Sequence, residues 1–541
     1  MHFLYYNLIA ISILGYGFFF NKSLNLNSRN IGIIGLAGIF FLILLSYISS
    51  FFVAHGYIFN SIILSIGIFF LLYFFNKNQI NKKDLITFFL VFLFLFIFIM
   101  NGKNHDDFPY YHFPYTFLLT QDSHPFGLGQ INNGFRNPSS LFFLNSLFYL
   151  PKIDIYLLHV GSVYFLGFAN LFFLKNIFDQ KKYKNIKFYN LLNLFFLVFI
   201  NIFFYRLAEY GTDRLGSILI IMCFMVLFLL INNDLVNIKS ERKELVGFLF
   251  IIGSMAISMK PFYLIYFSLI FFLIYYKNLN ETLLDFLRSK LSILIFLFVG
   301  FIFFINFVNS GCLLFPAKFT CFEQAQWSVS KKEVEDVRIW YELWAKGGAT
   351  PNFTVENREI YIINFNWLPN WIDVYFFNKI SDYFIGIIIT IIILYLFFKT
   401  EKKINIYQRN SFILILFLFF YLLEWFLFHP SLRYGGYHIF ILLAFIPLAI
   451  HLERYKLKWA DFKKRSIILI FITLIVFLGR NINRLDKEYN VYNYNIFENM
   501  NYKFIGGDKD FYFRYENLLD DKNLNHNYLN FLGKKILIIT N

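Results

Sequence analysis

The stretch NGKNHDDFPYYHFPYTFLLTQDSHPFGLGQINNGFRNPSS, residues 101–140, stands between long apolar runs dominated by Phe, Leu and Ile. It holds three His, three Asp and a turn-forming Gly/Asn segment that ends at Arg136. A loop that only joins two membrane helices does not need this density of polar and aromatic groups. Polar chemistry concentrated at the mouth of an apolar bundle is typical of a functional site. We therefore predict that this loop carries the active site and that the helices around it hold it in place.

The composition indicates a polytopic membrane protein. Of the 541 residues, 58% are hydrophobic, 23% aromatic and only 15% charged, and the mean hydropathy is +0.56. A soluble domain has about 25% charged residues, so this chain cannot cover a water-facing surface. The formal net charge of +15 falls in short loops between apolar runs, where membrane topology explains it, and we expect no nucleic-acid partner. The first apolar run lacks a basic leader and a cleavage site, which predicts a membrane helix rather than a signal peptide.

Apolar runs that approach the length of a membrane span recur along the whole chain. A helix needs roughly 20 apolar residues to cross the hydrocarbon core. The runs are 3–20, 31–54, 57–75, 85–100, 153–174, 190–205, 215–232, 245–259, 261–276, 291–309, 383–398, 411–428, 437–452 and 466–479. The fold class that we predict is an all-α polytopic membrane protein with about 14 transmembrane helices.

Lys and Arg residues alternate between the two sides of this predicted bundle. Two to six of them occur in each of the loops 21–30, 76–84, 175–189, 233–244, 277–290, 399–410 and 453–465, and the intervening short loops hold fewer. Positively charged loops face the cytoplasm. Both termini and the 101–140 loop are then expected outside. We predict the inner membrane of a bacterium, with an active site that faces the periplasm.

Two predicted outer loops stand out by their length. The first spans 101–152 and the second spans 310–382. Trp favours the headgroup level, so we expect part of the second loop to lie against the bilayer. Its five Trp are Trp327, Trp340, Trp344, Trp367 and Trp371. The polar tail 480–541 ends in KKILIIT, a strand-like segment, and is predicted to form a small outer appendage.

The triplet His105-Asp106-Asp107 follows the fourth apolar run at the outer membrane boundary. Two adjacent carboxylates at a low-dielectric edge repel, so one of them binds its proton more tightly. This arrangement suits a general base, or a site for a divalent cation such as Mg or Mn on Asp106 and Asp107. The alternative is that both Asp cap a short helix that starts at Pro109. The spacing of the three His is irregular, which predicts aromatic residues at the interface rather than a zinc site. His105 and His112 are also candidates for substrate contact.

Two further outer segments supply charged candidates. The segment 205–214 contains Glu209 and Asp213, which either join the site or form salt bridges with their neighbours Arg206 and Arg214. Lys260, in Met-Lys-Pro between two apolar runs, is isolated at a depth where an unmatched cation is costly. We therefore expect Lys260 to have an anionic partner, either in the protein or in a ligand.

A third outer turn, 428–438, reads FHPSLRYGGYH. Its Arg433 matches phosphate geometry, and the faces of Tyr434 suit a sugar or an isoprenoid. Together with His438, these residues are predicted to contact a lipid-linked phosphate. Arg136 could clamp a phosphate in the same way, or serve only as an anchor at the interface.

The three cysteines divide by position. Cys312 and Cys321 open the second outer loop on the predicted oxidising side, which favours a disulfide between them. Cys223 lies inside an apolar run and is expected to be a buried thiol.

This arrangement resembles the GT-C superfamily of integral-membrane glycosyltransferases. Members carry an acidic motif in the first large outer loop, directly after a membrane helix, and a second large outer loop six helices later. Here the acidic triplet follows the predicted helix 85–100, and the loop 310–382 follows the seventh helix of such a module. Glu209 and Asp213 occupy the outer loop where some members have a second acidic residue. The resemblance covers roughly residues 85–400 as topology, and as a motif it covers only the triplet.

The resemblance also divides the chain. It implies three additional helices in 1–84, a GT-C-like seven-helix module in 85–309, the second outer loop in 310–382, further helices in 383–479 and the tail 480–541. The additional helices are a departure, because the family usually starts near its N-terminus.

What the resemblance implies is inverting transfer of a hexosyl or pentosyl unit from a polyprenyl-phosphate donor to a glycan, lipid or protein acceptor. Asp107 or Asp106 would be the base. Arg433, Lys260 or Arg136 would stabilise the departing phosphate. A divalent cation is not required by every member.

Three other classes remain open at this stage. An O-antigen polymerase or ligase would rely on Arg433 and His438 rather than on paired Asp. A transporter or flippase would need polar residues in mid-membrane, for which Glu424 is the clearest candidate. A non-catalytic scaffold would use the polar loop as a docking surface.

Overall fold

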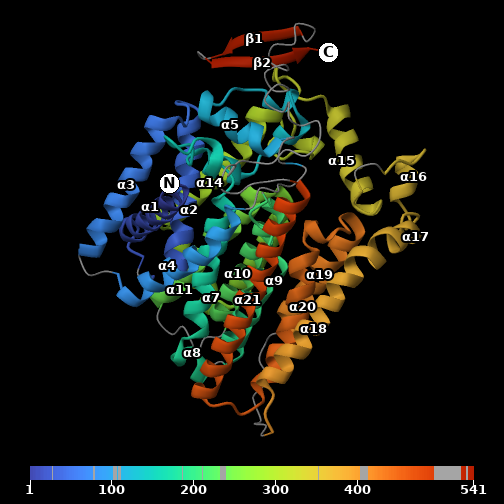
Figure 1. Cartoon of the computed structure of the whole chain (residues 1–541). Helices are drawn as coiled ribbons and strands as arrows, with labels where there is room; N and C mark the ends of the chain where they lie inside the picture. Colours follow the sequence, from blue (N-terminus) through green and yellow to red (C-terminus); the bar gives the residue numbers. More distant parts are fainter. Residues whose placement is uncertain are drawn as a thin grey trace.

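The computed structural model describes the chain except for residues 27, 77–79, 101–106, 108–110, 186, 210, 232–238, 351–352, 402–411, 493–524, 532–533 and 541. The fold is helical, apart from a hairpin near the C-terminus (Figure 1). In this hairpin β1 (Asn525–Phe531) pairs antiparallel with β2 (Lys534–Thr540). The strand predicted for KKILIIT is confirmed as β2.

Each predicted apolar run overlaps a helix. In chain order these helices are α1 (His2–Ser23), α2 (Ile31–Ser50), α3 (Tyr57–Asn76), α4 (Lys82–Leu95), α7 (Gly161–Ile177), α9 (Lys187–Phe203), α10 (Thr212–Ile231), α11 (Lys239–Met259), η6 (Pro261–Leu269) with α12 (Ile270–Tyr275), α14 (Lys290–Ser310), α18 (Ser381–Phe398), α19 (Phe412–Phe428), α20 (Gly436–Glu453) and α21 (Trp459–Tyr492).

Shorter elements connect these helices. They are η1 (Phe96–Phe98), α5 (Phe113–Gln121), η3 (Leu128–Gln130), η4 (Asn133–Phe135), α6 (Ser140–Ser146), η5 (Ile155–Leu157), α8 (Gln180–Asn185), α13 (Lys277–Leu287), η7 (Lys318–Thr320), α15 (Lys331–Lys346), α16 (Arg358–Ile362), α17 (Leu368–Trp371), the π-helix η8 (Ile372–Ile380) and η9 (Leu432–Tyr434).

The lengths of the helices support a multi-pass membrane protein. Within the described residues, eight helices are long and apolar enough to cross a membrane. A ninth span arises if Pro261–Tyr275 and Lys277–Leu287, bent by 116°, count as one. The other predicted spans are shorter or more polar; α4, for example, has 14 residues before the turn η1. About 14 spans therefore remain a prediction, while the multi-pass helical architecture stands.

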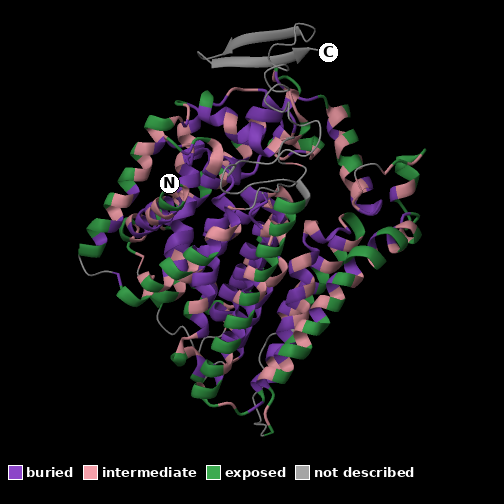
Figure 2. Ribbon diagram, in the orientation of Figure 1, coloured by how far each residue is buried: buried purple, intermediate pink, exposed green. Residues whose placement is uncertain are grey.

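The N-terminal helices are part of the central packing. Helix α1 packs against α2 and α3, and α2 packs against α7, α6, α11 and α14. Close approach of backbones makes this possible, because a Cβ added at Gly15 would lie 1.9 Å from the carbonyl oxygen of Gly67. Small residues let membrane helices approach in this way. Buried residues accordingly fill the middle of the bundle (Figure 2).

The two ends of the bundle carry different loops. Figure 1 places α5 and α15, from the two long predicted outer loops, at one end and α8 at the other. Helix α8 carries Lys182 and Lys184 in its last turn and lies in a loop predicted to be cytoplasmic. The loop with α8 therefore lies at the opposite end of the bundle from the two long loops, in agreement with the alternation of charged loops.

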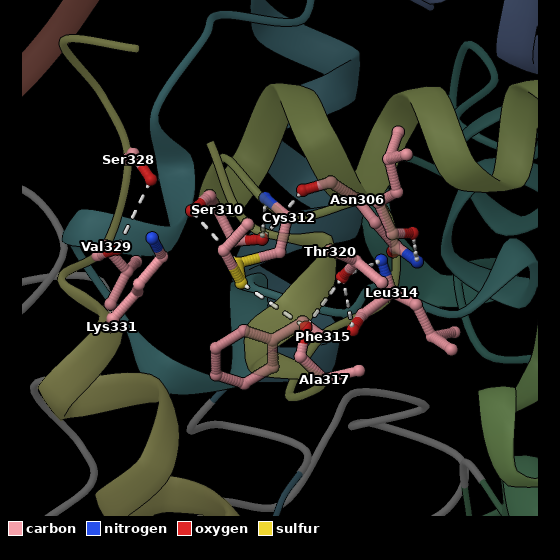
Figure 3. Close-up of a disulfide and its surroundings, with 12 residues drawn as sticks. Asn306, Ser310, Cys312, Leu314, Phe315, Ala317, Thr320, Ser328, Val329 and Lys331 are labelled. Atoms are coloured by element: carbon pink, nitrogen blue, oxygen red, sulfur yellow. Dashed lines mark hydrogen bonds between the residues drawn. A yellow bond between two sulfur atoms is a disulfide. The ribbon is translucent and has the colours of Figure 1, made fainter. Parts of the chain in front are cut away.

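A disulfide closes the start of the second long loop, as predicted. Cys312 and Cys321 are bonded, and within the loop Thr320 donates a hydrogen bond from Oγ1 to the Ala317 carbonyl oxygen, 2.8 Å away (Figure 3). The disulfide belongs to a small apolar cluster with Phe315, Val329 and Val334. Val334 lies on α15, so the N-terminal half of that helix packs against the disulfide through this cluster.

Removing the disulfide is expected to destabilise this region. The double variant Cys312→Ser/Cys321→Ser should lose about 3 kcal/mol of stability, because closing a loop of this length limits the unfolded chain. Limited proteolysis of the detergent-purified protein would show faster cleavage near α15. Dithiothreitol should reproduce the effect in the wild type and leave the double variant unchanged. Cys223→Ala is the matched control, and equal cleavage of all three proteins would contradict the expectation.

Candidate functional site

Four charged side chains from distant parts of the chain meet at the end of the bundle that carries α5 and α15. Arg433 donates from Nε to Oδ2 of Asp213 over 2.9 Å, and its Nη2 lies 3.5 Å from Oδ2 of Asp107. Lys260 Nζ lies 3.7 Å from Oδ1 of Asp213. We call Asp107, Asp213, Lys260 and Arg433 the charge cluster. All four were candidates from the sequence, and their contacts confirm that these four predicted outer segments share one side.

Local structure explains where three of these residues lie. Asp213 is in the first turn of α10, where the helix dipole favours a negative charge. Lys260 has extended backbone directly after α11, because a residue before proline avoids the helical region. Arg433 lies in the turn between α19 and α20, which is closed by Gly435 at φ 114°, a conformation that favours glycine.

Exposure differs between the two carboxylates. The Asp213 side chain is only 11% exposed, whereas Asp107 and Arg433 keep 30% and 29% of their side-chain surface. Asp213 is a buried carboxylate between two cations, so its role is to hold Arg433 and Lys260 in position. Asp107 is the accessible carboxylate and the one that a ligand can reach.

Aromatic rings surround the charge cluster. Tyr111 donates from its hydroxyl to Oδ2 of Asp107 at 3.4 Å. The Arg433 guanidinium lies 5.2 Å from the ring centre of Trp344 and 5.7 Å from that of Tyr434. Trp344 and Tyr434 meet edge to face with centroids 5.6 Å apart. Such cation–π contacts are stronger when the cation is shielded from water.

The surroundings fix the protonation of two of these groups. Burial, and after it the Asp107 carboxylate, raise the pKa of Tyr111 well above its usual value, so the hydroxyl remains a donor. Burial lowers the pKa of Arg433, but the carboxylates of Asp213 and Asp107 help raise it overall well above its usual value. Arg433 is therefore a permanent cation in this site.

Glu209 has different partners. Its carboxylate is buried and accepts hydrogen bonds from Arg206, the shorter at 2.6 Å, and it also pairs with Arg484 of α21. The sequence left local salt bridging open for Glu209, and the structure confirms that alternative. A carboxylate held by two guanidinium groups serves as an anchor and is poorly suited to the catalytic role predicted for it.

Three other predicted contact residues are buried in structural roles. Arg136 donates to Glu333 at 2.5 Å and to the Gly129 carbonyl oxygen, so it joins the two long loops as an anchor and not as a phosphate clamp. His112 packs between the rings of Tyr111 and Phe142. These placements disfavour the substrate-binding roles of Arg136 and His112, which stay predictions.

His438 is the third of these residues. Its Nδ1 lies 3.1 Å from Ser217 Oγ, and its Nε2 lies 2.5 Å from the hydroxyl of Tyr266. With both ring nitrogens engaged, His438 ties α20 to α10 and η6. These contacts disfavour the substrate contact of His438, which stays a prediction.

Two of the predicted site residues, His105 and Asp106, lie outside the described residues. In the part of the chain that the structure describes, no group of three or more His, Cys, Asp or Glu side chains could hold a metal ion. The divalent cation on Asp106 and Asp107 therefore remains a prediction.

Sequence reasoning missed the aromatic part of the site. Trp344 was grouped with the other Trp of its loop as a bilayer contact, yet it packs on Arg433. Among these five Trp, only Trp340 is exposed. The available signal was the stripe of Val337, Trp340, Tyr341 and Trp344, whose spacing is that of one face of a helix.

The fold and the site together define a class: a multi-pass helical membrane protein whose loops converge on a partly buried charge cluster at one end. The chain belongs to the family described as a domain of unknown function (DUF8201), whose model matches residues 1–440. This match includes the N-terminal helices and every member of the charge cluster. None of the curated proteins and none of the solved structures that were compared matches the chain.

Proposed function

We propose that this protein is a GT-C-like glycosyltransferase that transfers a sugar from a polyprenyl-phosphate donor to an acceptor at the outer, periplasmic face of a bacterial inner membrane. One observation carries the proposal. Asp107 and Arg433, 326 residues apart, meet at one end of a bundle of apolar helices and leave one carboxylate accessible. An accessible carboxylate beside fixed cations supplies both charges that such a transfer needs.

Each residue of the charge cluster has a part in this reaction. Asp107 accepts the proton of the acceptor hydroxyl as that oxygen attacks the anomeric carbon. The bond from the anomeric carbon to the phosphate oxygen breaks with inversion, and the phosphate leaves with the electron pair. Lys260 and the remaining N–H groups of Arg433 stabilise the negative charge that develops there. Asp213 holds Arg433 in position.

An apolar groove near the charge cluster is suited to bind the lipid chain of the donor. Its volume is about 400 Å³ and its lining comes only from apolar and aromatic side chains, among them Phe384, Phe419 and Phe440. Two lining residues, Trp371 and Trp425, donate their indole N–H groups to the carbonyl oxygens of Pro430 and Ser431. The groove therefore adjoins the turn that carries Arg433, where a lipid chain can lie beside its phosphate.

The other classes have less support. A polymerase or ligase mechanism built on His438 is disfavoured, because both of its ring nitrogens are already engaged. Glu424, the residue that favoured a transporter, lies near the outer end of α19 with Oε1 3.7 Å from Nε2 of His429. It is therefore not a mid-membrane charge.

The test is turnover by the purified full-length protein in detergent. The substrates are a panel of radiolabelled polyprenyl-phosphate sugars, assayed with and without Mg²⁺ or Mn²⁺. We expect the wild type to release the sugar from at least one donor and Asp107→Asn to release it at least about 100 times more slowly. No release from any donor, with or without metal, would overturn the proposal.

A further inference from the structure

Helix α15 presents an aromatic stripe to the site. It starts at Ser330, whose side chain caps it by accepting from the backbone N–H of Glu333. Glu333 holds Arg136 at one end of the stripe and Trp344 packs on Arg433 toward the other. Trp340 and Tyr341 lie between these two fixed points. Residues at this spacing share one face of a helix.

The exposure of Trp340 is unusual for its position. Val337, one turn earlier, packs on the disulfide cluster, and Trp344, one turn later, is partly covered by Arg433. Trp340 nevertheless keeps 42% of its surface exposed. An indole that is exposed on the same stripe as two packed neighbours is open to contact by a ligand.

The groups around this exposed indole favour a neutral polyhydroxylated ring as its ligand. Tyr341 is close enough to Tyr111 and Tyr434 to influence their pKa values, so aromatic groups approach the charge cluster from three segments. The two carboxylates of the charge cluster are balanced by its two cations, so a neutral ring fits beside it. Aromatic rings offer a face to the apolar side of a sugar, and carboxylates accept hydrogen bonds from its hydroxyls.

We propose that Trp340, Tyr341 and Trp344 form the platform that binds the sugar of the donor and holds its anomeric carbon near Asp107. This inference rests on the proposed function and adds to it the residues that recognise the sugar. The phosphate and the lipid chain lie outside the platform, toward Lys260 and the apolar groove. Trp340 is then a binding residue whose effect appears only when a sugar is present.

The experiment compares two probes on full-length protein in detergent. One set consists of farnesyl-phosphoryl sugars, and the other probe is farnesyl phosphate, which has no sugar. For at least one glycosylated probe, Trp340→Ala should weaken binding by about tenfold, the size of a lost aromatic stacking contact. Binding of farnesyl phosphate should not change. Trp340→Phe keeps an aromatic face and should retain most of the affinity.

A control on the same helix is Asp336→Ala, an exposed residue outside the stripe, which should bind both probes as the wild type does. Equal weakening for both probes, or no weakening for any sugar, would overturn the platform. A wild type that does not distinguish the probes would overturn it as well. Transfer that is unaffected in Trp340→Ala would reject the platform and leave the proposed function standing. Sugar-dependent binding without transfer would overturn the proposed function and leave the platform as a sugar-binding site.

Discussion

Replacing Arg433 by Gln is expected to abolish sugar transfer and to lower the free energy of unfolding by about 3 kcal/mol, the lower end for a broken buried ion pair. The lower end applies because Arg433 is still 29% exposed. The loss arises because the carboxylate of Asp213, which is 11% exposed, loses its 2.9 Å contact with a guanidinium. Arg433→Lys keeps the charge but cannot reach both carboxylates as a planar fork, so a smaller loss is expected.

Denaturant titration of the detergent-solubilised variants measures this effect. Adding Asp213→Asn to Arg433→Gln removes the buried charge and should restore much of the stability without restoring transfer. The control is Arg480→Gln, because Arg480 lies over the ring of Tyr205 rather than in the charge cluster. Unfolding of Arg433→Gln at the wild-type midpoint would show that the contact with Asp213 does not stabilise the fold.

Asp107→Asn is expected to lower the rate of transfer by a factor of about 100 to 10,000, the usual contribution of a general base. The fold should be retained, because Asp107 is 30% exposed and its contact with Arg433 is long, at 3.5 Å. Single-turnover transfer from the active donor measures the loss, and an unchanged affinity for the donor separates chemistry from binding.

Asp122 supplies the control for that variant. It is an exposed Asp in the same long loop, and Asp122→Asn should transfer sugar at the wild-type rate. Asp106→Asn, assayed beside it, tests whether the neighbouring carboxylate is the base instead. Wild-type transfer by Asp107→Asn would remove this residue from the mechanism.

The helical elements were well predicted from the sequence because a membrane-spanning helix needs a long apolar run, and such runs are visible in the composition. Every apolar run overlaps a helix, and the loop containing α8 lies at the end opposite α5 and α15, as the Lys/Arg alternation predicted. The number of spans was harder to predict. An apolar run does not show that α4 ends at Leu95 or that the chain bends by 116° after Tyr275.

Residue types within the site were predictable, but their pairing was not. Asp107, Asp213, Lys260 and Arg433 were recognised as charges near the outer membrane boundary. Arg136 looked equivalent to Arg433, and only tertiary packing directs the first to Glu333 and the second to Asp213. Glu209 differs from Asp213 for the same reason, since its partner Arg484 belongs to a helix far along the chain.

The distance along the chain between Asp213 and Arg433 has a consequence for biogenesis. Arg433 is synthesised 220 residues after Asp213, when α10 and α11 have long since left the ribosome. Each nascent chain therefore passes through a period in which Asp213, in the first turn of α10, lacks the guanidinium that later holds it. We expect insertion of the hairpin α19–α20 to be the step that supplies this contact. Chains truncated before this hairpin are expected to be preferred targets of membrane proteases.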